Sequence, residues 1–380
     1  MKTVCENAAC VGCMACVDAC SQKAIVVQDE ITHYNAVIDP EKCVECGACY
    51  RVCQNNGFDE ESLHEPVAWH QGWAKDPEVR KNSSSGGFAQ AISRAFLDEG
   101  GVVCSCRFLN GEYAFALATT PEEAAAFCGS KYTKSNAMEA YTQVKEALRQ
   151  GNSVLFIGLP CQVAAMKRYI PKKWQEQLYT IDLICHGTPS PKILSGFLAE
   201  NGRKTAHDSD VTFREGNRYQ LRQKGKAIVG FSDQDAYSYA FLKCAIFTEN
   251  CYRCRFAQTK RGGDLTLGDS WGSDLPPEER RRGISLALVQ TEKGRHLLSI
   301  APLHLAEVDS SCAIAHNGQL SHPSVPHPRR EAVLSAIRGG GSTRKALASL
   351  RSRKQKVVNS VKFFIPWKLR TKIKGMLSKK

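Results

Sequence analysis

The sequence lacks several features that define familiar protein classes. Its longest apolar runs, such as 154–157, are far shorter than the roughly 18 residues that a membrane-spanning helix needs, so we expect no transmembrane segment. The opening residues, MKTVCENAACVGC, contain no apolar stretch before the first cysteines, which argues against a secretory signal. Neither a G-x-G-x-x-G nor a Walker-A motif occurs, which weakens Rossmann and P-loop interpretations. These absences predict a cytoplasmic protein.

Acidic residues are absent from the C-terminal end. Residues 332–380 contain 14 of the 51 Lys and Arg residues and no Asp or Glu, so the rest of the chain is close to neutral although the whole has a formal charge of +13. With 43 % hydrophobic and 23 % charged residues over 380 positions, the composition is that of a globular protein of two to three domains. We expect a near-neutral folded body and a basic tail at 339–380.

Cysteine, in contrast, is abundant, and its first group repeats. A Cys-x2-Cys-x2-Cys-x3-Cys run occurs twice within residues 1–62, a spacing in which three thiolates bind one [4Fe–4S] cluster and the fourth cysteine binds the other. Zinc sites use two to four cysteines in separated pairs, which disfavours zinc. In a reducing cytoplasm, the 18 cysteines indicate metal or redox chemistry rather than disulfides. We assign the first cluster to Cys10, Cys13, Cys16 and Cys53, and the second to Cys20, Cys43, Cys46 and Cys49.

Residues 1–62 thus resemble the bacterial two-cluster ferredoxins. The proline that usually follows the fourth cysteine is replaced by Ser21 and Gln54, which affects the turn rather than the ligands. Cys5 lies outside the pattern and is expected to be a spare thiol.

The body, residues 66–330, alternates short β-branched runs with helix-like stretches. We expect strands at 102–106, 153–157, 179–184, 227–231 and 286–290, and helices at 89–97, 137–149, 161–169 and 237–247. This alternation favours an α/β body with a mixed sheet. The run Gly339–Ser342 indicates a linker to the tail.

Two polar motifs in the body suit a phosphate-containing ligand. Ser83–Gly87 precedes an expected helix, where small residues let backbone N–H groups close on a phosphate. Ordinary helix capping explains the same residues. Gly129–Tyr132 offers a cation and an aromatic ring, suitable for a pyrophosphate and a stacked ring, although a surface lysine is an equal alternative.

The later cysteines follow predicted strands. Cys161 comes after 153–157 and Cys185 after 179–184, and ligands of open α/β sheets gather outside the carboxyl ends of strands. Cys251 and Cys254 add a Cys-x2-Cys pair, so four thiols are available for a third cluster. Buried structural cysteines, a redox dithiol or a zinc half-site are the alternatives.

Taken in order, the motifs of the body resemble the coenzyme F420 hydrogenase/dehydrogenase beta-subunit family. They are Ser-Ser-Ser-Gly-Gly at 83–87, Gly-Ser-Lys-Tyr at 129–132, Gly-Leu-Pro-Cys-Gln at 158–162, Ile-Cys-His-Gly at 184–187, Cys-x2-Cys at 251–254 and Gly-Asp-Ser-Trp-Gly at 268–272. The resemblance implies FAD beside Ser84, Ser85, Gly86, Gly87, Lys131 and Tyr132, and a third [4Fe–4S] cluster on Cys161, Cys185, Cys251 and Cys254. Cys104, Cys106, Cys128 and Cys244 match no motif and are expected to be core thiols. The expected fold is a small α+β two-cluster ferredoxin domain, a mixed-sheet α/β flavin-binding body and a basic tail.

The resemblance also implies an oxidoreductase activity. FAD would exchange a hydride with a soluble donor or substrate, either the deazaflavin coenzyme F420 or an unidentified polysaccharide-pathway substrate, and [4Fe–4S] clusters would pass single electrons to a redox partner protein. His186, beside Cys185, is a candidate proton donor, with a structural place in the turn as the alternative. The rival function is an electron-carrier subunit without a substrate of its own.

The tail suits a membrane surface. Pro366 can begin a helix whose apolar stripe, with basic residues largely off it, would be Leu369, Ile373, Met376 and Leu377. Such a helix suits peripheral contact with anionic lipid at the inner face of the membrane. A disordered, solvated tail is the alternative. Nucleic-acid binding is not expected, because the tail offers few aromatic residues for stacking.

Overall fold

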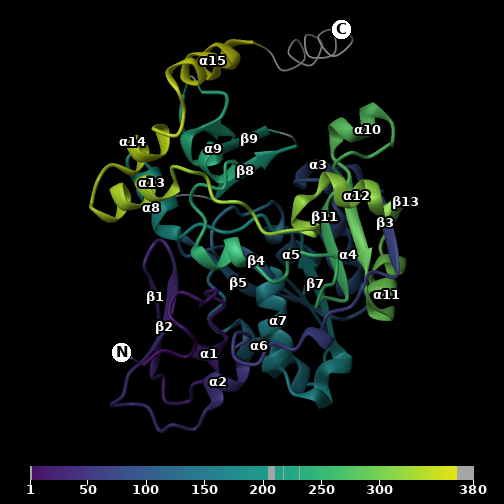
Figure 1. Ribbon diagram of the computed structural model, residues 1–380. Helices are drawn as coiled ribbons and strands as arrows, with labels where there is room; N and C mark the ends of the chain where they lie inside the picture. The colour runs from purple at the N-terminus through teal and green to yellow at the C-terminus, as the bar shows by residue number, and fades with distance from the viewer. Residues whose placement is uncertain (1, 204–209, 217, 231, 366–380) are drawn as a thin grey trace.

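The N-terminal domain folds around its cysteines. The computed structural model describes residues 2–203, 210–216, 218–230 and 232–365. An antiparallel pair, β1 (Ile25–Asp29) and β2 (Tyr34–Ile38), lies beside two short helices, α1 (Ala15–Asp18) and α2 (Ala48–Val52), all purple in Figure 1. The helices begin after Met14 and Gly47, whose left-handed backbones turn the chain at equivalent places in the two repeats. Apolar side chains of both strands are buried against Cys10, Cys16 and Cys53.

Hydrogen bonds fasten this domain to the body. The Asp18 carboxylate accepts from three backbone N–H groups at the start of helix α6 (Ala140–Arg149) and so caps a helix of the body. From the body, Arg168 donates to three backbone carbonyls within 51–57, and the Tyr141 hydroxyl donates to the Cys13 carbonyl at 2.6 Å. The N-terminal domain and the body therefore form one packed unit, because side chains of each hydrogen-bond to the backbone of the other.

An eight-stranded sheet forms the centre of the body. Its order is β13 (Leu303–Glu307), β3 (Ala68–Ala74), β12 (Ser285–Val289), β11 (Leu265–Asp269), β7 (Leu178–Leu183), β6 (Val154–Gly158), β4 (Val102–Leu109) and β5 (Glu112–Ala118). Strands β11, β7, β6 and β4 run parallel, and the outer neighbours pair antiparallel. The mixed α/β sheet predicted from the sequence is confirmed.

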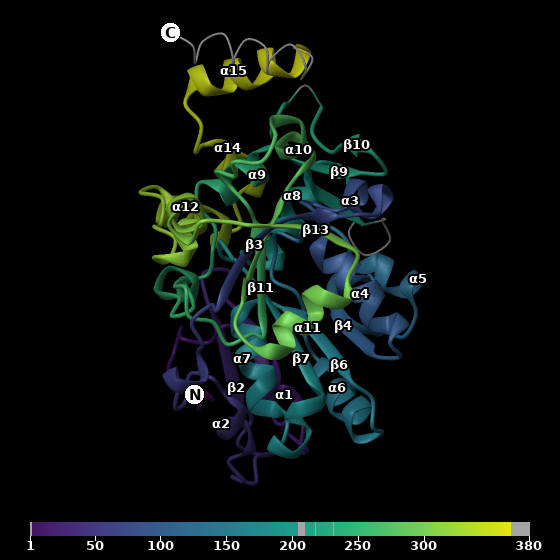
Figure 2. The ribbon, with the colours of Figure 1, turned by 90° about the vertical axis from the view of Figure 1, so that its right-hand side faces the viewer.

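Helices cover both faces of the sheet, because the central strands are apolar on both sides. On β6, Leu155 and Ile157 face α4 (Phe88–Asp98) and α11 (Glu292–Ile300), whereas Val154 and Phe156 face α6 and α7 (Pro160–Tyr169). Figure 2 shows α11 on one side of the strands. Truncating such a core side chain lowers the free energy of unfolding by roughly 2–5 kcal/mol. Because helices pack on both faces, the ends of the central strands are held in place.

A second, smaller layer lies beyond the sheet edge. It contains a three-stranded sheet of β8 (Val211–Glu215), β9 (Arg218–Gln223) and β10 (Lys226–Ala227), with α8 (Pro191–Ala199), α9 (Ala236–Leu242), α13 (Arg330–Arg338) and α14 (Thr343–Ala348) packed around one apolar core. Gly339–Ser342, expected to be a linker, is a short turn, because Ser342 caps α14 and Leu347 is fully buried in this core. The ordered body thus continues beyond the expected linker.

Most other expected elements occur with shifted ends. The helix expected at 137–149 begins at Ala140, and the one expected at 237–247 ends at Leu242, shortly before Cys244 takes a left-handed backbone. Within the described residues of 227–231, strand β10 includes only Ala227. The remaining helices are α3 (Pro77–Asn82), α5 (Pro121–Ala124), α10 (Pro277–Arg282) and α12 (Ser310–His316), with 3-10 turns η1 (Glu60–Ser62), η2 (Ala125–Phe127), η3 (Lys172–Gln177), η4 (Glu249–Arg253) and η5 (Gly318–Leu320).

The last described helix, α15 (Arg353–Phe364), lies at the opposite end of the molecule from the N-terminal domain (Figures 1 and 2). No helix in the described part of the chain combines the length and apolarity needed to cross a bilayer. The tail stripe at Leu369, Ile373 and Met376 falls outside the described residues.

Candidate functional site

The first group of predicted ligands gathers in the core of the N-terminal domain. Cys10, Cys13, Cys16 and Cys53 are all buried. Burial, together with the nearby Cys53 and Cys161, raises the pKa of Cys13 to about 12. Cys5, expected to be a spare thiol, also lies in this group, where contact with Cys10 raises its pKa to about 11. Thiols with raised pKa values stay protonated until a metal displaces the proton, so cluster binding here would release protons.

The second group lies nearer the surface. Cys20, Cys43 and Cys49 are half-buried and interact with one another, whereas Cys46 is exposed. The backbone N–H of Ala24 donates to the Cys20 sulfur at 3.3 Å, the kind of bond that tunes a cluster. Val44 and Tyr50, both exposed, flank this group. The second group therefore faces solvent, unlike the first.

A cavity of about 310 Å³, here called the sheet-edge cavity, opens at the carboxyl ends of the parallel strands. Cys106 of β4, Gly158 of β6, Leu183 of β7 and Asp269 of β11 all line it. The placement agrees with the rule that open α/β sheets bind ligands at this edge. Ser84, Ser85, Gly87, Lys131, Tyr132 and His186, predicted from separate motifs, meet in this one cavity.

Hydrogen bonds join the two polar motifs at the cavity wall. The backbone N–H of Ser130 donates to Ser84 Oγ at 2.7 Å, and Ser85 Oγ donates to the Ile284 carbonyl. Lys131 Nζ donates to the carbonyls of Phe127 and Cys128. Gly86 lies behind the wall, where an added Cβ would come within 2.3 Å of a backbone oxygen of β3. Ser84, Ser85, Gly86 and Lys131 thus contribute to the wall of the cavity itself, in addition to the ligand contacts expected from the two motifs.

The cavity also retains groups suited to a dinucleotide. Helix α4 begins at this cavity after Gly87, whose backbone is left-handed. No described side chain caps this end of the helix, so its first N–H groups face the cavity. Gln90 Nε2 is buried on the wall without a hydrogen-bond partner among the described residues. Tyr132 stacks on Phe241 at 4.4 Å between ring centroids. Unpaired donors beside flat apolar rings fit FAD.

A buried ion pair lies on the other side of the cavity. Both terminal guanidinium nitrogens of Arg214 donate to the Asp269 carboxylate, at 2.6 and 2.9 Å. The Arg214 guanidinium also lies over the rings of Tyr219 and Trp271. Sequence reasoning named Asp269 and Trp271 through their motif but missed Arg214 and Tyr219, which belong to β8 and β9 and match no motif.

His186 lies between two cavities. Its side chain is exposed to the open cavity space, and partial desolvation by the surrounding protein lowers its pKa, partly offset by Asp269. Asp264, in contrast, is structural, because its carboxylate accepts hydrogen bonds from Thr180 and Thr291.

A second cavity of about 310 Å³, here called the four-cysteine cavity, is lined by Cys161, Cys185, Cys251 and Cys254. Cys161 lies in the first turn of α7, Cys185 follows β7, and the last pair belongs to η4 and its end. Burial raises the pKa of Cys161 to about 11 despite the nearby cation of Lys134. The Cys251 sulfur accepts from the backbone N–H of Thr188 at 3.4 Å.

The donor set of this cavity fits a [4Fe–4S] cluster, which is bound at its corners by four cysteine thiolates. Among the described residues, no group of three or more His, Cys, Asp or Glu could hold a single metal ion. Of the cysteines expected to be core thiols, Cys104 is buried and Cys106 and Cys128 line the sheet-edge cavity.

The four-cysteine cavity connects the other sites. It shares residues 185–188 with the sheet-edge cavity. On its other side, Gln54 Nε2 of the N-terminal domain donates to the Cys161 carbonyl at 3.0 Å, and Lys134 Nζ donates to the Val11 carbonyl at 2.8 Å. The order in space is therefore sheet-edge cavity, four-cysteine cavity, first cysteine group and second cysteine group.

Comparison with known proteins matches each region. Residues 69–141 match the N-terminal part, and residues 151–307 the C-terminal part, of the coenzyme F420 hydrogenase/dehydrogenase beta-subunit family, and residues 9–56 match the 4Fe-4S dicluster domain. A similar solved structure is a chain of the F420-reducing [NiFe] hydrogenase complex from Methanosarcina barkeri, with 17 % identity over 77 % of this chain and 95 % of that one and a TM-score of 0.48.

A curated relative matches only the N-terminal region. It is a component of the ion-translocating oxidoreductase complex of Methanosarcina acetivorans, 39 % identical over 59 residues, which are 16 % of this chain and 20 % of that protein. The chain thus spans about a fifth of the length of this relative. The two beta-subunit matches, in contrast, follow one another along most of the body, and so the chain belongs to the coenzyme F420 hydrogenase/dehydrogenase beta-subunit family of oxidoreductases, joined to a 4Fe-4S dicluster domain.

Proposed function

We propose that the protein is an iron–sulfur flavoprotein that exchanges a hydride with a soluble substrate and relays electrons to a partner protein. The sheet-edge cavity would hold FAD, and the four-cysteine cavity would hold a third [4Fe–4S] cluster. When bound, FAD converts hydride chemistry into single-electron steps that iron–sulfur clusters can carry. The observation that supports this proposal best is the wall at 185–188, which both cavities share.

The residues of the sheet-edge cavity would bind and orient the cofactor. The first N–H groups of α4 and the Gln90 amide would donate to its phosphates, where the positive end of the helix favours an anion. The Tyr132 and Phe241 rings would contact a flat ring system. His186, whose pKa is lowered by desolvation, would accept a proton when the substrate is oxidised and donate one when the substrate is reduced.

The N-terminal domain would bring electrons to the surface. The first cysteine group adjoins the four-cysteine cavity through Val11 and Gln54, and the second group reaches solvent at Cys46. Exposed Val44 and Tyr50 beside Cys46 would provide the apolar contact for a redox partner. Electrons could run in either direction along this order.

Family membership favours the deazaflavin coenzyme F420 as the hydride substrate, with a polysaccharide-pathway substrate as the alternative. An electron-carrier subunit without a substrate of its own is the rival function, favoured by the exposure of Cys46 in the second cysteine group. The two functions differ in what the sheet-edge cavity holds.

Cofactor content after anaerobic purification separates these functions. We expect about twelve irons per chain, since each cubane holds four, together with one FAD. Iron, acid-labile sulfide and released flavin are measured on the same sample. About eight irons without flavin would contradict the proposal and leave the electron-carrier function.

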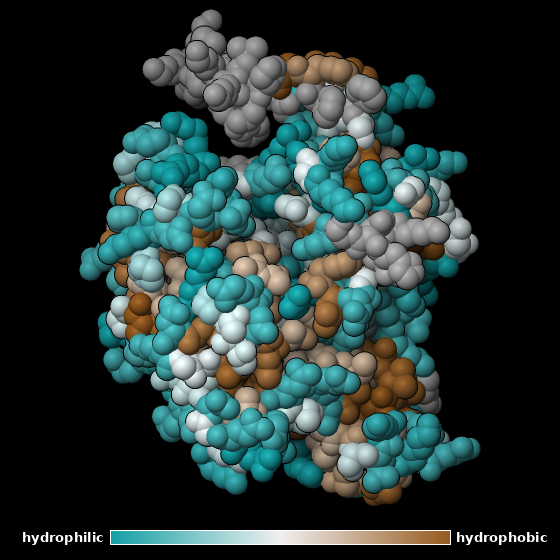
Figure 3. Space-filling view, turned by 180° about the vertical axis from the view of Figure 1, so that it is seen from behind, coloured by the Kyte–Doolittle hydropathy of each residue, from teal (hydrophilic) through white to brown (hydrophobic). Residues whose placement is uncertain are grey.

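We further propose that α15 brings the protein to the inner, anionic face of the membrane. Val357, Val361 and Phe364 follow one another at helical spacing and are 63 %, 53 % and 66 % exposed. Figure 3 shows hydrophobic side chains at the top of the molecule, where α15 lies. Four basic residues of the helix, Arg353, Lys354, Lys356 and Lys362, suit acidic headgroups.

Replacing Val357 and Val361 by aspartate should weaken binding to phosphatidylserine vesicles by about tenfold or more. Burying one valine contributes about 1.5 kcal/mol, and the new charges are repelled by the anionic surface. Co-sedimentation of the full-length protein measures the effect. Val325→Asp, at an exposed valine outside α15, is the control. Equal binding of the α15 double variant and the control would disprove membrane contact through this helix.

A further inference from the structure

Two basic side chains line the four-cysteine cavity together with its cysteines. They are Lys134, which is 4 % exposed, and Arg261, which is 1 % exposed. Basic side chains are almost never this buried without a compensating negative charge, because desolvation of an ion is costly. If the partners of Lys134 and Arg261 within the protein do not supply enough negative charge, a ligand of the cavity must supply the rest.

Arg261 is only partly compensated. Its Nη1 lies 3.8 Å from the buried Asp182 carboxylate, whereas Nε and Nη2 are buried without a hydrogen-bond partner among the described residues. Backbone hydrogen bonds with His64 in both directions hold the Arg261 main chain in place. Two donor nitrogens of the buried guanidinium thus remain for a ligand of the cavity.

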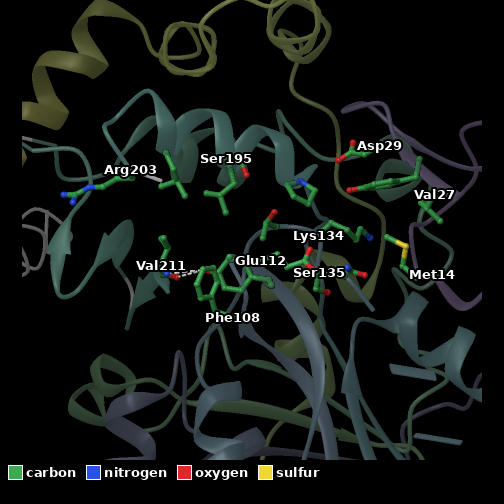
Figure 4. Close-up of a pocket in the computed structure, with 18 of the residues that line it drawn as sticks. Met14, Val27, Asp29, Phe108, Glu112, Lys134, Ser135, Ser195, Arg203 and Val211 are labelled. Carbon is green, nitrogen blue, oxygen red and sulfur yellow. Dashed lines mark hydrogen bonds between the residues drawn. The ribbon is translucent and has the colours of Figure 1, made fainter. Parts of the chain in front are cut away.

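Lys134 lies between the body and the N-terminal domain. Its ammonium donates to the uncharged Val11 carbonyl and lies 5.9 Å from the centroid of the Tyr34 ring. Figure 4 views it from a neighbouring cavity of about 190 Å³ and shows its side chain extending toward the side of Met14 and Val27. Burial alone would lower the pKa of Lys134, but the negative charge that Cys161, Cys251, Cys185 and Cys13 carry when ionised outweighs burial and raises it.

We propose that Lys134 and Arg261 compensate the charge of the third cluster from within its cavity and raise its reduction potential. This inference rests on the proposed third cluster. One electron entering the cluster adds one negative charge and breaks no bond. Fixed cations nearby stabilise the reduced cluster more than the oxidised one, and they do so strongly where water is excluded. Both act as positioning residues, because the ligands remain the four cysteines.

Replacing Lys134 by methionine should shift the reduction equilibrium of the third cluster toward the oxidised form by about tenfold or more, which equals about 59 mV for a one-electron couple. The potential is read by redox titration of the anaerobic holoprotein with electron paramagnetic resonance. The third-cluster signal is identified as the one that Cys254→Ala removes. Lys134→Gln removes the charge but keeps an N–H donor for Val11, and should shift the potential in the same direction.

Lys293→Met is a matched control. Lys293 also donates to backbone carbonyls, those of Gln175 and Leu178, and also lies near a tyrosine ring, but it is not among the residues that line the four-cysteine cavity. Its loss should leave the potential unchanged.

The outcomes separate this inference from the proposed function. A wild-type protein with about eight irons would remove the third cluster itself. With about twelve irons in wild type and variants, an unchanged potential in Lys134→Met would overturn the inference. A shift in Lys134→Met but not in Lys134→Gln would assign the effect to the hydrogen bond and would also overturn it.

Discussion

Replacing Cys254 by alanine should lower the iron content from about twelve to about eight atoms per chain and leave the flavin in place. Cys254 lines the four-cysteine cavity but not the sheet-edge cavity, so the change removes one corner ligand of the third cluster and no wall of the flavin cavity. Iron and flavin measured on one anaerobic sample give both numbers.

The control for this experiment is Cys312→Ala. Cys312 is half-buried like Cys254, yet it contacts the Gly272 carbonyl rather than other cysteines. It should keep all the iron. If Cys254→Ala also keeps about twelve irons, the third cluster is not bound in this cavity.

Replacing Ala89 by tryptophan should abolish flavin binding while the iron content stays at the wild-type level. Ala89 is the second residue of α4 and lines the sheet-edge cavity where the phosphates would meet the helix N-terminus. An indole there would occupy much of a cavity of about 310 Å³ and cover the first N–H groups. Flavin released on denaturation measures occupancy.

Iron content reports folding in the same sample, because the cluster cavities depend on the same packed body. Ala89→Ser, at the same position, should keep its flavin. Stoichiometric flavin in the tryptophan variant would place the cofactor elsewhere. Loss of iron together with flavin would instead indicate a general failure to fold, and a smaller substitution, Ala89→Leu, would then repeat the test.

The sequence predicted the features that depend on local spacing. We could predict the two cysteine runs, and the cysteines after strands β6 and β7, from short stretches of sequence. A cluster-binding loop and the end of a strand each depend on only a few consecutive residues. The resemblance to the beta-subunit family implied that Ser84 and Lys131 lie beside one ligand, and both line the sheet-edge cavity.

Residues whose partners lie far away in the chain were missed. Lys134 meets Val11, 123 positions earlier, and Arg214 meets Asp269, 55 positions later, with no repeated spacing to announce either contact. Gln90 was overlooked because an unpaired buried amide is recognised only once its neighbours are known. The misjudged linker at Gly339–Ser342 has the same origin, since glycine favours both spacers and tight turns.

The way Asp18, Arg168 and Tyr141 bind the N-terminal domain to the body has a kinetic consequence. Free ferredoxins reach their partners by diffusion, so their transfer rates depend on concentration, ionic strength and productive orientation. In the proposed relay, the first cysteine group already lies against the four-cysteine cavity, so that encounter is replaced by a fixed separation in whichever direction the electrons run. Salt and dilution would then affect only the rate of electron transfer between the second cysteine group, at Cys46, and the partner protein.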